Sequence, residues 1–212
     1  MRDAYHEQLD SVGHTLVEMA GLVGQALSRA TRALLEADLA VAEAVIAADD
    51  AVDALHRELD VRTLDLMARQ QPVAGDLRTL VTSLRMSADL ERMGDLARHI
   101  AKIARMRYPD YAIPEDLRAT ITRMGEIGVD LAARLAGIIE GKDVTDAQTL
   151  DAEDDAVDLL HRTIFEKLLR HDEPYPVETA IDVTLLSRYY ERYADHAVSV
   201  AKRLIFLVTG EH

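Results

Sequence analysis

Apolar residues recur every three or four positions along nearly the whole chain, with polar residues between them. This spacing is typical of amphipathic helices. The pattern is interrupted where Pro, Gly or Asp disfavours or caps a helix, near residues 38, 71–72, 108–114, 141–143 and 172–176. The interruptions predict six long helices over residues 4–36, 39–69, 73–107, 115–140, 144–170 and 177–209. We therefore predict an all-α protein in which short connections make successive helices antiparallel neighbours in bundles.

The sequence also repeats itself. Residues 49–57 read DDAVDALHR and residues 154–162 read DDAVDLLHR, so eight of nine positions agree at an offset of 105. In the third helix of each half the offset is 100, and the matched positions include Ser87, Glu91, Arg92, Asp95 and Lys102 with Ser187, Glu191, Arg192, Asp195 and Lys202. Such a repeat indicates one structural unit used twice. We predict two tandem three-helix bundles, over residues 1–108 and 109–212.

Composition narrows the classes of function. Cysteine is absent, which excludes disulfides, thiolate metal sites and cysteine nucleophiles. The net charge of −14 argues against a nucleic-acid partner and against adsorption to anionic lipid. No stretch approaches the roughly 20 apolar residues that cross a bilayer, and acidic residues within the first ten positions do not fit a signal peptide. We expect a cytoplasmic protein that does not insert into the membrane directly.

The two halves share pairs of acidic residues spaced four positions apart, which lie on one face of a helix. The second helix of each half carries Asp49 with Asp53 and Asp154 with Asp158, and the third carries Glu91 with Asp95 and Glu191 with Asp195. If these helices pack together, four carboxylates converge in each half. Neighbouring carboxylates repel unless a positive group lies between them, and their oxygens suit a hard cation such as Mg²⁺, Mn²⁺ or Fe, including a multinuclear cluster. These eight residues are our candidate metal ligands.

Other interpretations of the acidic pairs stay open at this stage. Arg92 and Arg192, directly beside the acids, are alternative salt-bridge partners, and a solvated acidic face needs no metal. His56 and His161 follow an Asp by three positions, which resembles the Glu-x-x-His step of carboxylate-bridged di-iron bundles. Those bundles have four helices rather than three, so we interpret these histidines as groups outside the ligand set or on the surface. His196 lies beside an acid only in the second half and is assigned no role. A metal-dependent oxidase or phosphatase and a metal-free helical scaffold are therefore both alternatives, although no catalytic motif is present.

A family resemblance then becomes visible. Residues 71–78, QPVAGDLR, and residues 89–95, DLERMGD, resemble the signature of the PhoU family of phosphate-specific transport accessory proteins. Residues 191–196, ERYADH, echo it more weakly, because the second half lacks the full QPxAxDLR segment and carries Tyr-Ala at positions 193 and 194. The resemblance extends over essentially the whole chain, including the duplication and the number of helices.

The resemblance implies a function that the residues alone do not. It implies a non-enzymatic negative regulator of the phosphate-starvation response, which couples a phosphate ABC transporter, through its ATPase subunit, to a sensor histidine kinase and modulates phosphate uptake. Such a protein would be recruited to the inner face of the membrane through its partners and would form a homodimer. The family's metal clusters at paired acidic motifs correspond here to the eight acidic residues named above.

Overall fold

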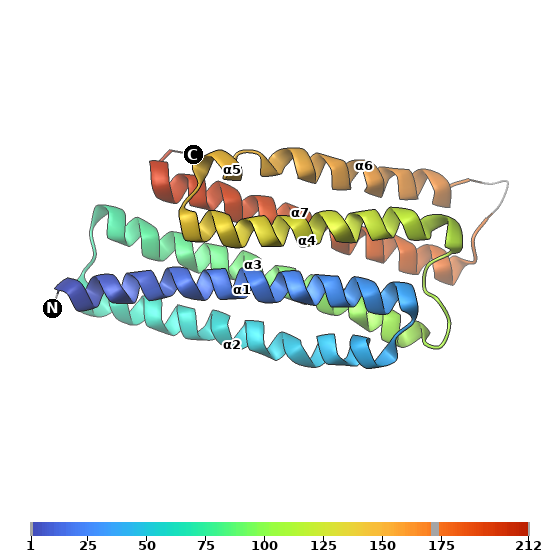
Figure 1. Ribbon diagram of the computed structural model, residues 1–212, viewed down its shortest axis with the longest axis horizontal. Helices are drawn as coiled ribbons and strands as arrows, with labels where there is room; N and C mark the ends of the chain where they lie inside the picture. The colour runs from blue at the N-terminus through green and yellow to red at the C-terminus, as the bar shows by residue number, and fades with distance from the viewer. Residues whose placement is uncertain (1, 171–173, 212) are drawn as a thin grey trace.

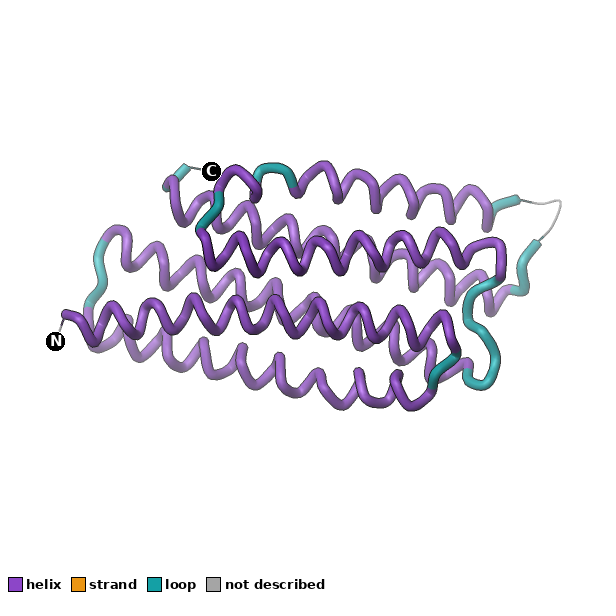
Figure 2. Tube along the Cα trace, viewed as in Figure 1, coloured by secondary structure: helices purple, strands orange, loops and turns teal. Residues whose placement is uncertain are grey.

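The computed structural model describes residues 2–170 and 174–211, and all regular structure in this part of the chain is helical (Figure 2). The long helices run side by side along an elongated molecule (Figure 1). Their bounds are α1 (Arg2–Glu36), α2 (Leu39–Gln70), α3 (Ala74–Arg107), α4 (Glu115–Gly141), α5 (Val144–Ala147), α6 (Leu150–Leu168) and α7 (Val177–Thr209). The all-α fold with six long helices is therefore confirmed, and most helix ends lie within two residues of the prediction.

The fifth predicted helix is the exception, because residues 144–170 form the single turn α5 followed by α6 rather than one helix. Asp143 caps α5 by accepting a hydrogen bond from the backbone N–H of Asp146 at 3.0 Å. The Thr149 hydroxyl donates to the Asp146 carbonyl at 2.8 Å, and Arg134 of α4 donates to the Asp146 carboxylate. The Thr149 side chain thus binds the Asp146 carbonyl, which a continuous α-helix would pair with the backbone N–H four residues further on, and α5 ends after one turn.

The two halves of the chain meet through corresponding helices. Helices α1, α2 and α3 contact one another, as do α4, α6 and α7, while α1 packs against α4 and α3 packs against α7. The buried apolar residues of both halves form one hydrophobic cluster, which runs from Val12 to Leu204. The division into residues 1–108 and 109–212 stays a prediction.

Small residues allow α1 and α4 to approach closely. A Cβ atom added to Gly24 would lie 3.0 Å from the Cβ of Ala132, and one added to Gly125 would lie 2.7 Å from the Cγ2 of Thr31. The hydroxyl of Thr31 is in turn hydrogen-bonded to the buried hydroxyl of Tyr190 at 2.8 Å. The contact between the halves is therefore close-packed, and α1 is linked to α7 as well as to α4.

Candidate functional site

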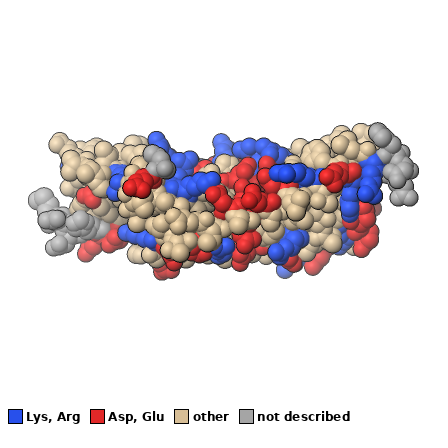
Figure 3. All heavy atoms as spheres, turned by 90° about the horizontal axis from the view of Figure 1, so that it is seen from above, with Lys and Arg blue, Asp and Glu red and all other residues tan. Residues whose placement is uncertain are grey.

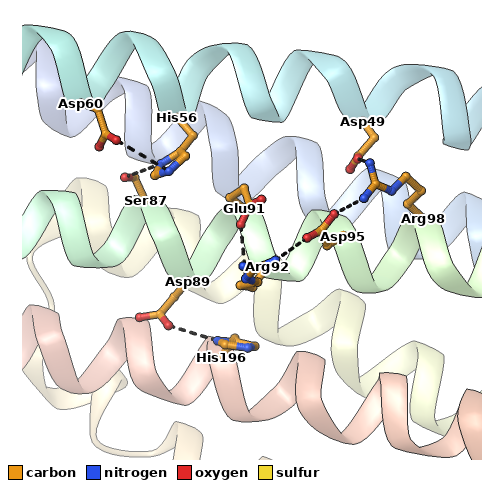
Figure 4. Close-up of polar contacts among 10 residues, drawn as sticks. All are labelled: Asp49, His56, Asp60, Ser87, Asp89, Glu91, Arg92, Asp95, Arg98 and His196. Carbon is orange, nitrogen blue, oxygen red and sulfur yellow. Dashed lines mark hydrogen bonds and ion pairs between the residues drawn. The ribbon is translucent and has the colours of Figure 1, made fainter.

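The first acidic cluster consists of Asp49 and Asp53 of α2 with Glu91 and Asp95 of α3, two helices that pack together. Asp49 is only 7% exposed, and its carboxylate lies against Gly94, where an added Cβ would be 3.3 Å from Asp49 Oδ1. Figure 4 shows Asp49, Glu91 and Asp95 on facing sides of the two helices. The convergence expected from the spacing is therefore present in the first half.

A guanidinium group lies between the acids of this cluster. Arg98 Nη1 is 2.5 Å from Asp49 Oδ2, and Arg98 Nη2 donates to Asp95 Oδ1 (Figure 4). Arg92, the partner suggested by the sequence, donates to the other oxygen of Asp95 at 2.8 Å, but its side chain is 62% exposed against 26% for Arg98. Because exposed ion pairs contribute little, Arg98 is the main positive counterpart of the first cluster.

The pKa values of the first cluster show how far Arg98 compensates the negative charge of its acids. Burial raises the pKa of Asp49; Arg98 opposes the shift, and the nearby charges of Asp53, Asp95 and Glu91 add to it. Burial and the charge of Asp95 raise the pKa of Glu91 in the same way. Burial and the neighbouring acids therefore outweigh the compensation by Arg98 in the first cluster, although Arg98 bridges two of its members.

The second acidic cluster consists of Asp154 and Asp158 of α6 with Glu191 and Asp195 of α7, and it has no equivalent of the bridging arginine. Val198 occupies in α7 the position that Arg98 occupies in α3. Arg188 donates to Glu191 Oε1, but Glu191 Oε2 and Asp154 Oδ1 are buried with no hydrogen-bond partner among the described residues. Buried polar atoms without partners are costly. Asp49 Oδ2 in the first cluster likewise forms no hydrogen bond among the described residues, but it lies 2.5 Å from Arg98 Nη1, and the second cluster has no such bridging counter-ion.

Electrostatics agree with this difference between the halves. Burial, followed by the charges of Asp195, Asp158 and Glu191, raises the pKa of Asp154 to about 6. Burial and the charge of Asp195 also raise the pKa of Glu191, with Arg188 opposing. Near neutral pH, the ionised second cluster therefore carries a repulsion that no bridging guanidinium relieves.

The two clusters differ in how well they fit a metal ion. As the side chains stand, no three Asp, Glu or His residues within the described ranges are placed closely enough to hold one, so a cation would have to draw carboxylates inward. In the second cluster the donor chemistry fits a hard cation, because two buried carboxylate oxygens lack partners. In the first cluster it does not, because Arg98 already pairs with Asp49 and Asp95.

The two repeated histidines have different surroundings. His56 Nδ1 lies 3.0 Å from the Ser87 hydroxyl, and its Nε2 lies 3.8 Å from Asp60 (Figure 4). The ring of His161 packs edge-on against Phe165 with centroids 4.8 Å apart, and burial and the charge of Arg188 lower its pKa. A neutral His161 beside the second cluster adds no positive charge to it.

The sequence did not identify a polar link between the halves. Asp89 of α3 is hydrogen-bonded to His196 Nδ1 at 3.1 Å (Figure 4) and accepts from Arg203 Nε at 2.6 Å, both on α7. Burial alone would raise the pKa of Asp89, but the hydrogen bonds with His196 and Arg203 lower it overall. His196, to which we assigned no role, therefore joins the two halves. No local signal could have shown this, since its partner lies 107 positions away in sequence.

The molecular surface shows the charges in context. On the face drawn in Figure 3, Asp and Glu side chains gather in the middle, with Lys and Arg side chains on either side of them. None of the helices that the structure describes is long and apolar enough to cross a membrane.

Comparison with known proteins places the chain in a family. The family model described as the PhoU domain matches residues 16–104 and 121–204. The "Phosphate-specific transport system accessory protein PhoU homolog 2" of Mycobacterium tuberculosis is 47% identical over 210 residues, covering 99% of both chains. A PhoU homolog of Deinococcus radiodurans is 31% identical with the same coverage. The crystal structure of PhoU from Pseudomonas aeruginosa superposes with a TM-score of 0.87 at 25% identity, covering 98% of this chain and 100% of that one. The chain thus belongs to the PhoU family.

Proposed function

We propose that this protein is a non-enzymatic regulator of phosphate transport, which represses the phosphate-starvation response when phosphate is plentiful. In this role it binds the ATPase subunit of a phosphate ABC transporter and a sensor histidine kinase, and so conveys the state of the transporter to the kinase. The observation that carries the proposal is the 47% identity, over 99% of both chains, to relatives named phosphate-specific transport system accessory proteins. We expect a cytoplasmic homodimer that reaches the membrane through these partners.

The fold supports the role of an adaptor. The halves are joined by the packing of α1 on α4 and of α3 on α7, and by ion pairs such as that of Arg107 with the buried Asp182. A close-packed body of long helices keeps distant surface patches in a fixed relation. Two partners bound to different patches would therefore meet in a defined geometry.

Affinity purification from phosphate-replete and phosphate-starved cells tests the proposal. We expect the tagged protein to recover the transporter ATPase and the sensor kinase, and a deletion strain to express starvation genes in high phosphate. Recovery of neither partner, together with unchanged gene expression in the deletion strain, would contradict the proposal. Turnover of a phosphomonoester by the purified, Mn²⁺-loaded protein would instead favour the metal-dependent enzyme.

We further propose that the second acidic cluster binds a divalent or trivalent cation, and that this cation stabilises the packing of α6 on α7. Glu191 is 8% exposed, and its Oε2 and the Oδ1 of Asp154 are buried without partners among the described residues. A hard cation bound by oxygen ligands would supply the missing positive charge. The cation would neutralise carboxylates of the second cluster as Arg98 neutralises Asp49 and Asp95 in the first.

Metal titration tests this second proposal independently of partner binding. Mn²⁺ should raise the thermal stability of the chelator-treated protein, and Asp154→Asn combined with Glu191→Gln should abolish the increase. The matched pair in the first half, Asp49→Asn combined with Glu91→Gln, should retain it. Equal loss of the Mn²⁺ response in both pairs of variants would show that both clusters bind metal. Absence of the response in the wild type would exclude the site.

A further inference from the structure

A basic cavity lies between α3 and α7, away from the acidic clusters. Its volume is about 260 Å³, and both halves of the chain contribute to its lining, which consists of Thr82, Arg85, Ser199, Lys202, Arg203 and Phe206. Three of these six residues are cationic and two carry hydroxyl groups. In a protein with a net charge of −14, a cavity with this lining calls for an explanation.

The two ends of the α3–α7 contact differ although the halves are related by duplication. The opposite end of the α3–α7 contact holds Arg107 against Asp182, which is 3% exposed. Thr82 occupies in α3 the position that Asp182 occupies in α7, since the offset between these helices is 100. The end of the contact that contains the cavity therefore has no counterpart of Asp182, and its buried acid is Asp89, which pairs with Arg203.

The cations of the cavity are available to a ligand to different degrees. Asp89 holds Arg203 through Nε at 2.6 Å, a contact that orients the guanidinium and uses only one of its five donors. Lys202 pairs with Asp151 at 2.9 Å, but both side chains are more than 60% exposed, so the pair is weak. Arg85 is exposed and forms no ion pair within the described residues.

Neutral donors complete the lining, and a further arginine lies beside it. The hydroxyls of Thr82 and Ser199 form no hydrogen bond in the described part of the chain, whereas that of Thr79, one turn before Thr82, donates to a helix carbonyl. The guanidinium of Arg78 lies 5.9 Å from the centre of the Phe206 ring, which adds positive charge near the cavity. The negative charges of Asp89 and Asp151 do not cancel the positive charges of the lysine and the arginines, so the net charge around the cavity is positive.

We propose that this cavity binds a small phosphate-containing anion. Guanidinium groups with hydroxyl donors match the geometry of phosphate oxygens, and the cationic lining disfavours neutral ligands. The volume is smaller than the roughly 300–1,000 Å³ of pockets that take drug-sized molecules, so inorganic phosphate or pyrophosphate fits better than a nucleotide. A ligand held by Arg85 of α3 and Arg203 of α7 would bridge the two halves. The proposal does not depend on the identity of the regulatory partners.

Calorimetric titration at constant ionic strength tests the site with inorganic phosphate, pyrophosphate, adenosine monophosphate and sulfate. We expect saturable binding of phosphate or pyrophosphate and much weaker binding of adenosine monophosphate. Arg85→Gln should weaken binding by about tenfold or more, because it removes a charge-assisted contact. Thr82→Val should weaken binding without changing the net charge.

Arg105→Gln is the matched control, because Arg105 is an exposed arginine of the same helix with no ion pair among the described residues and lies away from the cavity. It should bind phosphate as the wild type does, and circular dichroism should show that all three variants are folded. Two outcomes would overturn the proposal: no saturation with millimolar phosphate or pyrophosphate, or an equal loss of affinity in the Arg85 and Arg105 variants. Sulfate binding as strong as phosphate binding would also contradict a site for phosphate groups.

Discussion

Arg98 of α3 is paired with Asp49 of α2, with Nη1 at 2.5 Å from Oδ2, and it also donates to Asp95 of its own helix. The Asp49 side chain is 5% exposed, so the pair is formed largely out of contact with water. Its partner position in the second half is Val198, which cannot do the same for Asp154 and Asp195.

Replacing Arg98 with Met should destabilise the protein by about 2 kcal/mol at pH 7, because Asp49 is left buried without its counter-ion. This value lies below the usual cost of breaking a buried pair, since Arg98 is itself 26% exposed. Urea unfolding followed by circular dichroism measures the change. Arg92→Met, at a 62% exposed position in the same cluster, should cost less than about 0.5 kcal/mol, and equal losses would refute the bridging role of Arg98.

The pH dependence of stability should report on Asp154. Its pKa is about 6 in the folded protein against an ordinary 3.8, so between these values the folded state binds more protons than the unfolded state. The contribution of Asp154 to stability is therefore present below about pH 4 and is lost as the pH rises to 6. With chelator present, Asp154→Asn should remove this loss and stabilise the protein at pH 7 by about 1–2 kcal/mol, allowing for solvent screening.

Asp155→Asn is the control for this measurement, because Asp155 is the exposed neighbour of Asp154 on α6. Its unfolding free energy should follow the wild-type pH profile. An Asp154→Asn protein that is no more stable than the wild type at pH 7 would show that the second cluster is not under electrostatic strain.

The ion pair between the halves should also be measurable. Arg107 donates to Asp182, whose side chain is 4% exposed, and lies 3.0 Å from Glu178, whose side chain is 77% exposed. Asp182→Ala should reduce the unfolding free energy measurably, because it removes the buried partner of Arg107. Glu178→Ala removes the exposed acidic partner of the same arginine, and it should lower the unfolding free energy by less than about 0.5 kcal/mol. Similar losses in urea unfolding for both variants would contradict this ranking.

Two glycines of α4 should respond in opposite directions to substitution by Ala. At Gly125 the added methyl group would lie 2.7 Å from Thr31 Cγ2, and moving Thr31 would disturb its hydrogen bond to Tyr190. We expect a loss of about 1–3 kcal/mol in unfolding free energy. Gly137 has open space at the Cβ position, so Gly137→Ala should stabilise the protein by roughly 0.5–1 kcal/mol through helix propensity. Thermal unfolding of the two variants checks both signs.

Much of the fold could be predicted from the sequence, because apolar spacing and helix-breaking residues are local signals. They predicted the six long helices, and the repeat showed which helices of the two halves correspond. The break at Thr149 was not predicted, because it depends on Arg134 of another helix. The packing of α1 on α4 and of α3 on α7 was likewise not predicted, since it rests on contacts between residues far apart in sequence.

The candidate site was predicted in part. Spacing of four positions on two helices of each half indicated that the acids would face one another, and α2 with α3 and α6 with α7 do pack together. The sequence pointed to Arg92 and Arg192 as counter-ions because they adjoin the acids. It missed Arg98, which follows Asp95 by three positions, because nothing in the repeat marks an arginine that is present in only one half. Whether the acids bind metal stays a prediction.

Because α1 packs on α4 and α3 on α7, the chain resembles a symmetric homodimer whose two subunits have been fused. In a true homodimer every substitution appears twice, so a residue that suits one subunit is imposed on the other. Fusion removes that constraint, and each half can acquire its own side chain at a corresponding position. Two differences are of this kind: Arg98 corresponds to Val198 in the second half, and Asp182 corresponds to Thr82 in the first. Through such differences, the same fold has two halves with distinct chemistry.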